Sequence, residues 1–445
     1  MKEEFVVLED IKSRSPFPIG LQYNAPARGV WNIVNIAMML PESLIIFVCP
    51  IGCMRGVTLT AAQMGAMDRF CAIFVNEQDV LSGNGEQLII EGVSEVLDEM
   101  EKTPRAVSIF TSCIDQFLGT DHKLVFDTLN DKYKEVGFIE CFMTPTMRKG
   151  ALPPDPIMRK QMFHLLSPNP KRKKTVNFIG NHVPLPQENE FRELILEAGY
   201  KVLDLANCNT FDEYLEMQYS EFNIMIHPNG NLAMDDLTKR LAIKEIRIPL
   251  SYEEKEITEN YVTLSRKLGI KNTNEQMERL IMKREAASRA MEETQKLLQN
   301  TPIAIDYTMT MRPFGLAKLL VSHGFFVERI YAESCVKEEE EAFVWLKAHA
   351  KHMKWYYPMT PSMSVISRNG EESFLALGQI AAYFTNTKHF VNVVESDGMY
   401  GFHGVIRLMD AMREAFYQEK DTKQIIEVKA LGCFNKGGSY IWSKL

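Results

Sequence analysis

The sequence lacks the features that mark several large classes of protein. Its 50 Lys and Arg residues are outnumbered by 58 Asp and Glu, so the formal charge is −8 and the basic surface that nucleic acid attracts is missing. No apolar run reaches the roughly 18 residues of a membrane span. The opening residues, with two acids ahead of the first apolar run, do not resemble a secretory signal. We expect a cytoplasmic protein that binds neither nucleic acid nor membrane, with its eight cysteines outside any disulfide framework.

Familiar nucleotide and hydrolase motifs are missing as well. Neither G-x-x-x-x-G-K-[ST] nor G-x-G-x-x-G occurs, so the chain is not expected to cradle ATP by itself. An H-E-x-x-H zinc motif and a G-x-S-x-G nucleophile elbow are also absent. Any metal or catalytic chemistry must therefore depend on other residues.

The 445 residues instead show short apolar, β-branched runs that alternate with helical patterns. Such runs are typical of parallel strands that helices cover on both faces, which gives doubly wound sheets. A Pro-containing basic linker at 167–174 and the end of a long charged helix at 274–299 divide the chain. We predict three α/β domains, at 1–170, 171–300 and 301–445. The predicted strands are 43–49, 71–76, 106–111, 137–143, 175–180, 201–205, 223–227, 245–249, 302–308, 325–331, 354–357 and 389–394.

Cysteines follow two of these strands. Strand 43–49 ends at Cys49 and continues through Pro50, Ile51 and Gly52 to Cys53, and strand 106–111 is followed by Ser112 and Cys113. Thiolates at one edge of a parallel sheet could share a soft metal or an iron–sulfur cluster. The alternative is core filling, because cysteine is often buried and no C-x-x-C pair is present. Core filling is expected for Cys71, Cys141, Cys208, Cys335 and Cys433.

A third stretch, 394–404, carries glycines at 398, 401 and 404 ahead of a predicted helix at 405–416. Such glycines suit either a close approach of backbone to a ligand or a tight helix entry, and both interpretations stay open. His403 lies in this loop and His227 follows another strand. On residue type alone, a structural role is expected for each histidine.

Together these stretches resemble the nitrogenase component 1 superfamily, in order and spacing across nearly the whole chain. The superfamily includes the molybdenum–iron protein subunits, cofactor-assembly scaffolds and dark-operative protochlorophyllide reductase. The segment 50–53 is similar to the G-P-x-G-C ligand motif, and Cys113 with 118–121 to C-x-x-x-x-I-G-D-D. Segment 76–83 is similar to E-K-D-I-V-F-G-G, segment 175–180 to the strand that opens the second domain, and segment 400–404 to Y-H-G-Y-D-G.

The resemblance implies three Rossmann-like domains and an oxidoreductase role. It implies an iron–sulfur cluster, 4Fe-4S or larger, held by Cys53 and Cys113 at an interface with a homologous second subunit or a second copy. Electrons would come from a separate ATP-hydrolysing iron protein and reduce an unidentified substrate. The alternatives are a cofactor-assembly scaffold, a non-catalytic partner subunit and a cluster-free binding protein.

The departures from the family pattern matter equally. The family's first cluster cysteine belongs near 25–29, where this sequence has none, so Cys49 is the candidate replacement. Pro228 and Tyr400 stand where the family's cysteine and histidine anchor the molybdenum–iron cofactor. We therefore expect neither that cofactor nor dinitrogen reduction. His227, Tyr400 and His403 are instead expected to line a pocket for a substrate or an unidentified second metal cofactor.

Overall fold

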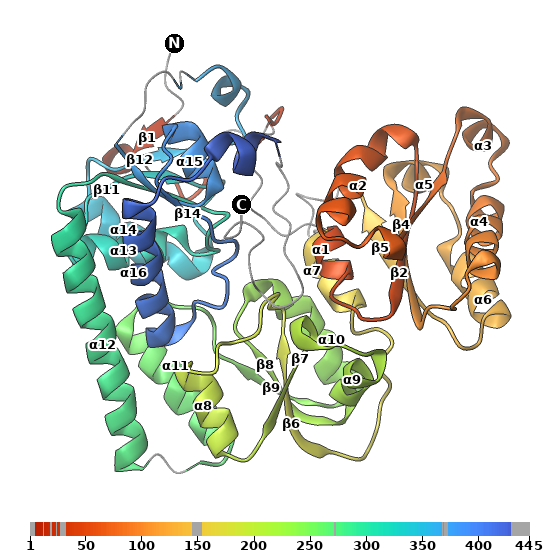
Figure 1. Cartoon of the computed structure of the whole chain (residues 1–445), viewed down its shortest axis with the longest axis horizontal. Helices are drawn as coiled ribbons and strands as arrows, with labels where there is room; N and C mark the ends of the chain where they lie inside the picture. The colour runs from red at the N-terminus through yellow and green to blue at the C-terminus, as the bar shows by residue number, and fades with distance from the viewer. Residues whose placement is uncertain are drawn as a thin grey trace.

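The computed structural model describes residues 5–428 apart from 12, 18–19, 24, 27–32, 145–153, 271–272, 367 and 369–372. It is a mixed α/β structure with three lobes, each built on its own sheet (Figure 1). Two sheets are wholly parallel and the third is mostly parallel. The predicted fold class is confirmed.

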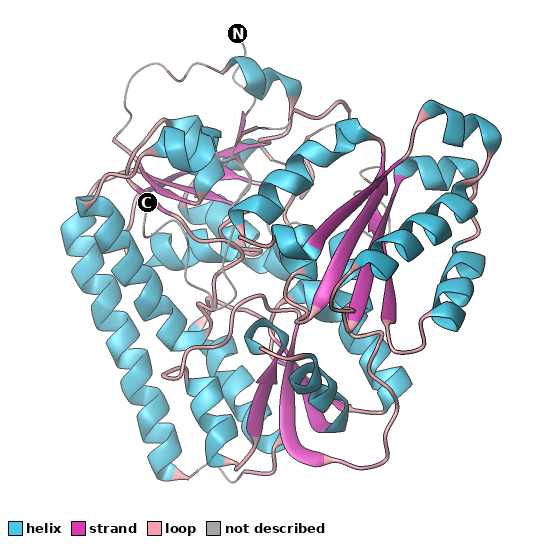
Figure 2. Ribbon diagram, turned by 45° about the vertical axis from the view of Figure 1, so that its right-hand side comes forward, coloured by secondary structure: helices cyan, strands magenta, loops and turns pink. Residues whose placement is uncertain are grey.

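The first sheet has the order β3-β2-β4-β5. Its strands are β2 (Ser43–Cys49), β3 (Phe70–Phe74), β4 (Ala106–Ser112) and β5 (Gly137–Met143). Every residue of β2 and β4 is buried, because these apolar central strands are covered on both faces. On one face lie α4 (Gly85–Glu99) and α6 (His122–Lys132), and on the other α1 (Ile33–Ala37) and α7 (Pro154–Gln161) (Figure 2).

The second sheet repeats this arrangement in the order β7-β6-β8-β9. Its strands are β6 (Lys173–Ile179), β7 (Lys201–Asp204), β8 (Ser220–Met225) and β9 (Lys244–Arg247). The accompanying helices are α8 (Glu190–Glu197), α9 (Phe211–Glu216) and α10 (Asn231–Leu241). From there α11 (Glu254–Lys267) and the long α12 (Asn274–Leu298) carry the chain to the third lobe (Figure 1).

The third sheet combines both ends of the described chain, in the order β1-β12-β11-β10-β13-β14. Strand β1 (Phe5–Val7) pairs antiparallel with β12 (Lys354–Tyr356). The other strands are β10 (Ile303–Asp306), β11 (Val327–Tyr331), β13 (Leu375–Leu377) and β14 (Phe390–Val391). The helices are α13 (Pro313–Ser322), α14 (Glu340–His349), α15 (Gln379–Thr385) and α16 (Gly401–Tyr417), and α16 packs on α12.

Each of the twelve predicted strands has a counterpart, with local corrections. Strand 389–394 shrinks to Phe390–Val391 because the chain turns before residue 395, and the helix predicted at 405–416 begins at Gly401. Strands β1 and β13 were not expected. Since β1 lies in the last sheet, the division at residues 170 and 300 stays a prediction. Within the described ranges, no helix is long and apolar enough to cross a membrane.

Candidate functional site

Each sheet contains one point where the strand order reverses. The reversals fall between β2 and β4, between β6 and β8, and between β10 and β13. At such a point the loops that follow the two strands run to opposite faces and leave a crevice at the strands' carboxyl ends, where doubly wound sheets bind their ligands. The three crevices are therefore the places to look for chemistry.

The first crevice carries the predicted cluster cysteines. Cys49 ends β2, Cys53 ends the short helix η2 (Ile51–Cys53), and Cys113 begins α5 (Cys113–Leu118) directly after β4. Val48 pairs with Thr111 across the two strands, so all three cysteines follow the same sheet edge. A capping box between Ser112 and Asp115 fixes where α5 begins.

The three thiols differ in accessibility. Cys49 is fully buried, and its Sγ donates to the Met54 sulfur at 3.2 Å. Burial, with Cys53 and Asp115 nearby, raises the pKa of Cys49 to about 12 and opposes the thiolate form. Cys53 is exposed and Cys113 half-buried. Among the described residues, no group of three or more His, Cys, Asp or Glu is arranged to hold a metal ion. Cys53 and Cys113 are thus the accessible soft donors, and their ligand role stays a prediction.

Large apolar side chains stand in solvent at the same sheet edge. Ile51 of η2 is 74% exposed, Phe74 at the end of β3 51%, Leu81 of α3 (Glu77–Ser82) 87% and Phe117 of α5 81%. We call these four residues the cysteine-edge patch. Several exposed apolar side chains from adjacent loops are typical of a surface that another protein covers.

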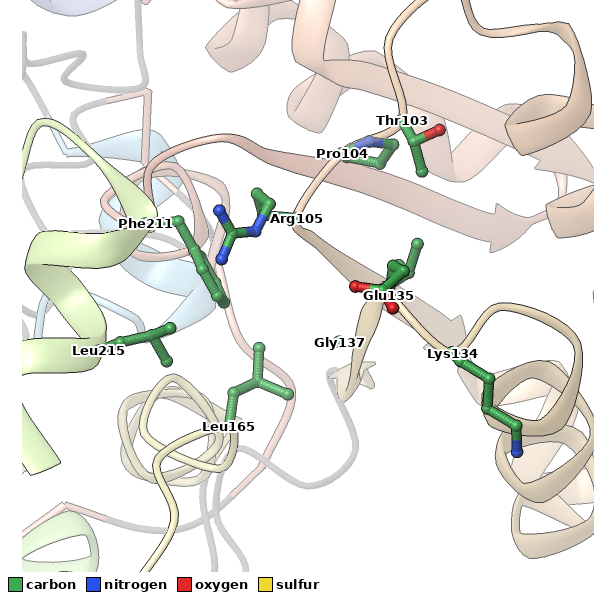
Figure 3. Close-up of a pocket in the computed structure, with 10 residues that line it drawn as sticks. Thr103, Pro104, Arg105, Lys134, Glu135, Gly137, Leu165, Phe211 and Leu215 are labelled. Atoms are coloured by element: carbon green, nitrogen blue, oxygen red, sulfur yellow. The ribbon is translucent and has the colours of Figure 1, made fainter.

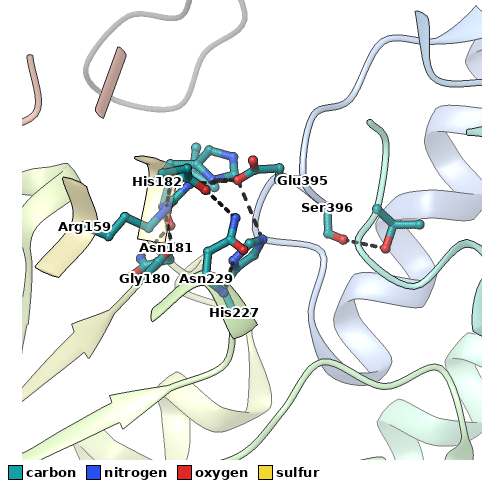
Figure 4. Close-up of polar contacts among 11 residues, drawn as sticks. Arg159, Gly180, Asn181, His182, His227, Asn229, Glu395 and Ser396 are labelled. Carbon is teal, nitrogen blue, oxygen red and sulfur yellow. Dashed lines mark hydrogen bonds and ion pairs between the residues drawn. The ribbon is translucent and has the colours of Figure 1, made fainter. Parts of the chain in front are cut away.

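The second crevice is filled by buried charges and imidazoles, which we call the Arg159 cluster (Arg159, Glu395, His182 and His227; Figure 4). Arg159 of α7 is only 2% exposed. Its guanidinium donates to Asp155 Oδ1 at 2.9 Å, to the Gly180 carbonyl at 2.5 Å and to Glu395 Oε2 at 3.0 Å. Since Gly180 follows β6 and Glu395 follows β14, one side chain ties the second and third lobes together.

His182 and His227 face the same carboxylate. Their nearest ring nitrogens, Nδ1 and Nε2, lie 3.4 and 3.6 Å from Glu395 Oε2. Burial, and secondarily the Arg159 charge, lowers the pKa of both imidazoles well below the ordinary value, so both are neutral at pH 7. His227 Nδ1 accepts from the Asn229 amide, which leaves the proton on Nε2, toward Glu395.

Unusual backbone conformations hold this cluster in place. Gly180 has φ +91°, and a Cβ there would lie 2.6 Å from the Gly230 Cα, so the loops after β6 and β8 touch directly. Glu395, Ser396 and Asp397 have consecutive positive φ angles of 46°, 66° and 40°. The Glu395 and Ser396 amides donate to the Thr308 and Met309 carbonyls at 2.8 and 2.6 Å. Left-handed non-glycine residues cost about 1–3 kcal/mol each and concentrate at functional sites.

At the third crevice a buried carboxylate accepts hydrogen bonds from the surrounding backbone. The Asp306 carboxylate at the end of β10 accepts from the amides of Thr308, Met309 and Ala381 at 2.8, 3.1 and 2.7 Å, and it is fully buried. A carboxylate has about four acceptor sites, and the three backbone amides occupy most of those on Asp306. The Asp306 carboxylate therefore joins the backbone of the loop after β10 to the first turn of α15.

The predicted pocket residues separate between two places. His227 belongs to the Arg159 cluster. Tyr400, the N-cap of α16, lies beside the same cluster, close enough for the Glu395 and Arg159 charges to act on its hydroxyl. It is 1% exposed, burial raises the pKa of its hydroxyl, and that hydroxyl has no hydrogen-bond partner among the described residues. His403 lines a cavity of about 490 Å³ with Arg192 and Arg407, and neither His227 nor Tyr400 reaches this cavity.

A larger cavity of about 600 Å³ lies at the first sheet, beside the amino ends of its strands and thus opposite the cysteines (Figure 3). Arg105 and Gly137, beside the amino ends of β4 and β5, line it together with Phe211 and Leu215 of α9. The Arg105 guanidinium lies 4.9 Å from the Phe211 ring centroid and 3.1 Å from Asp212. Because ligands of doubly wound sheets bind at the carboxyl ends, this cavity is not the candidate site.

Sequence reasoning missed Arg159, His182 and Glu395. A signal existed for two of them, because His182 follows β6 and Glu395 follows β14. Arg159 lies within a helix, and nothing in its neighbourhood along the chain distinguishes it from a surface arginine.

The likeness to known proteins agrees with this architecture. The sequence profile of the family described as "Nitrogenase component 1 type Oxidoreductase" matches residues 34–417. The solved structure titled "Nitrogenase Cp1 at pH 6.5" is similar over 91% of this chain and 95% of that chain, with a TM-score of 0.69 and 15% identity. "Nitrogenase Cp1 at pH 5" is similar over 93% and 94%, with a TM-score of 0.60 and 13% identity. No curated protein sequence matches the chain. Because the family profile spans most of its length, the chain belongs to the nitrogenase component 1 type oxidoreductases.

Proposed function

We propose that the chain is a component 1 subunit of a two-component reductase, with an iron–sulfur cluster on Cys53 and Cys113. The observation that carries this proposal is the pair of accessible thiols at the first crevice, beside the cysteine-edge patch. When bound, such a cluster supplies one-electron transfer at a potential that charge, hydrogen bonding and exposure tune. Two thiols are too few for a cubane, so a second chain seated on the patch would supply further ligands.

Electrons and ATP would come from outside this chain. Membership of the nitrogenase component 1 type supports a homologous subunit and a separate iron protein as the expected partners. The absence of both phosphate-cradling glycine motifs from this sequence supports hydrolysis by the partner and not by this chain.

The molybdenum–iron cofactor does not suit the residues at the second crevice. Pro228 has no side-chain donor, and burial opposes the phenolate form of Tyr400 by raising its pKa. The Arg159–Glu395 pair occupies the region beside His227 with protein atoms. These contacts support a reductase whose substrate is not dinitrogen.

A cofactor-assembly scaffold or a non-catalytic partner subunit is the second candidate. The buried Cys49, whose pKa is raised, is a poor thiolate ligand, so this chain offers few cluster ligands of its own. A small number of ligands favours either of these two roles over a catalytic one. A scaffold would bind a cluster without accepting electrons from an iron protein during turnover, whereas a non-catalytic partner would only complete the interface.

Anaerobic purification with an iron protein from the same source tests the proposal. We expect iron and acid-labile sulfide in the wild type, with most of both lost in Cys53→Ala and Cys113→Ala. Cys71→Ala is the matched control, because Cys71 lies half-buried inside β3, away from its carboxyl end. Iron content unchanged in all variants would overturn the cluster assignment. A bound cluster without ATP-dependent oxidation of the reduced iron protein would favour the scaffold.

A further inference from the structure

The cavity that His403 lines joins the second and third lobes. It has a volume of about 490 Å³ and lies between the loop 183–188, Arg192 of α8, and His403 and Arg407 of α16. That volume falls within the range of small-molecule sites, roughly 300–1,000 Å³. Two arginines from different lobes, Arg192 and Arg407, thus line one pocket that is open to solvent.

Two buried nitrogen atoms of residues that line this cavity have no hydrogen-bond partner among the described residues. Arg192 donates through Nη1 to the Leu185 carbonyl at 3.3 Å, whereas its enclosed Nε has no partner among the described residues. The Asp204 carboxylate lies close enough for its charge to be stabilised by Arg192, but it accepts its hydrogen bonds from the Asn181 side chain at 2.6 Å and the Ala206 amide at 3.1 Å. His403 Nδ1 is likewise enclosed without a partner in the described part of the chain. Buried donors are normally satisfied by water or a ligand.

Arg407 is only loosely held. Its Nη1 lies 3.3 Å from the Asp397 carbonyl and its Nη2 3.9 Å from the Asp397 carboxylate, and its side chain is 35% exposed. The other carboxylate of the lining, Glu188, is exposed, and Lys283 reaches its carbonyl and the Glu193 carboxylate. The guanidinium of Arg407 can therefore turn to an incoming acceptor without breaking a strong bond.

The amino end of α16 does not provide the binding groups. The Glu190 carboxylate already accepts from the Phe402 and His403 amides at 2.5 and 3.3 Å. A negative group is thus already placed against the positive end of the helix dipole. Recognition has to come from the side chains.

We propose that this cavity binds a small molecule through an oxyanion group, a carboxylate or a phosphate, which accepts hydrogen bonds from Arg192 and Arg407. Guanidinium forks suit two-oxygen anions, and such charge-assisted bonds are short and strong. The site adjoins the Arg159 cluster, because Val183 and Asp397 line the cavity while His182 and Glu395 belong to the cluster. Binding needs no electrons, so its test is independent of the proposed reductase activity.

Isothermal titration calorimetry of the purified full-length chain with succinate and with inorganic phosphate tests this site. We expect one of the two probes to bind with a Kd below about 1 mM. Succinate alone would indicate an organic acid as the ligand, and phosphate alone a phosphorylated compound. Heat from neither probe up to about 10 mM would overturn the proposal.

Variants locate the binding. Arg192→Gln and Arg407→Gln should each weaken binding about tenfold or more, the effect of losing a charge-assisted hydrogen bond. Arg289→Gln on α12, where the arginine side chain is 64% exposed and 4.0 Å from Glu285, should bind like the wild type. Should Arg192→Gln not fold, Arg407→Gln alone decides, because its side chain lies partly in solvent. Unchanged affinity in Arg407→Gln would contradict the assignment.

Discussion

Arg159 and Glu395 hold opposite charges where water does not reach, at 2% and 1% exposure. Desolvating such a pair costs about as much as its attraction returns, whereas removing one partner costs about 3–5 kcal/mol because the other charge stays buried. The pair therefore contributes little net stability. Its effect is to fix one arrangement of the loops after β6 and β14.

The two buried imidazoles make stability depend on pH. The folded-state pKa values of His182 and His227 lie well below 6.5, because of burial and then the Arg159 charge. As the pH falls below about 6.5, the histidines of the unfolded chain bind protons while those of the folded chain stay neutral. The free energy of unfolding therefore decreases as the pH falls below this value. With two such residues, we expect a slope of up to about 2.7 kcal/mol per pH unit.

Urea unfolding between about pH 5.5 and 7 measures this slope. The comparison is with the double variant His182→Gln/His227→Gln, which should show a flatter profile. Burial raises the pKa of Asp204 to about 7 and of Glu339 to about 8, and these groups change stability in the opposite direction. The difference between wild type and variant isolates the histidines. Parallel profiles would show that the imidazoles do not carry the effect.

At the scale of elements, one glycine sets the entry of α16. Gly401 has φ +69°, and a Cβ on it would collide with the Glu190 carboxylate that caps the helix. Gly401→Ala therefore adds left-handed strain of about 1–2 kcal/mol and displaces a cap worth about 1 kcal/mol. We expect a loss of at least about 2 kcal/mol in the free energy of unfolding, measured by denaturant titration.

Gly52→Ala is the matched control for that variant. A Cβ on Gly52 would meet nothing within 4 Å, and its φ lies outside the left-handed region. It should unfold like the wild type. Equal stability of Gly401→Ala and Gly52→Ala would mean that Glu190 does not cap α16 as described.

Two of the longest apolar strands could be predicted from the sequence to the residue, whereas two of the shortest strands were missed. Strands β2 and β5 match their predicted bounds because each is a seven-residue, mostly apolar run in a parallel sheet. Strands β1 and β13 have three residues each, too few to show a period, and their pairing depends on distant partners. Strand β14 ends early because residues 395–397 adopt left-handed backbone conformations. These residues include no glycine, so the sequence gives no sign of that conformation.

The same contrast holds for the site. Because ligands bind where parallel strands end, the sequence predicts Cys49, Cys53 and Cys113 at one sheet edge, and the structure has all three there. The salt bridge between Arg159 and Glu395 joins positions 236 residues apart, and only the packing of the lobes brings them together.

For the whole molecule, the cysteine-edge patch predicts assembly. Phe117 is 81% exposed beside Cys113, and a second chain that covers it would bury a large aromatic side chain. Phe117→Glu places a charge in that interface, where desolvation is costly. We expect light scattering of anaerobic samples to show a pair of chains for the wild type and single chains for the variant.

Val344→Glu serves as the control for assembly. Val344 is 61% exposed on α14 of the third lobe, away from the first sheet. This variant should pair like the wild type. Single chains in the wild type, with its iron content intact, would rule out the patch as the interface.

The pairing of β1 with β12 also has a consequence for biosynthesis. Phe5 pairs with Tyr356, which leaves the ribosome roughly 350 residues later, and at about 5–20 residues per second that delay is roughly 20–70 s. The first two sheets contain only strands made in the meantime, so each can form while β1 waits without a partner. A nascent chain thus carries an unpaired strand for most of its synthesis, and translation speed or a chaperone at the ribosome exit would govern how safely the last sheet is completed.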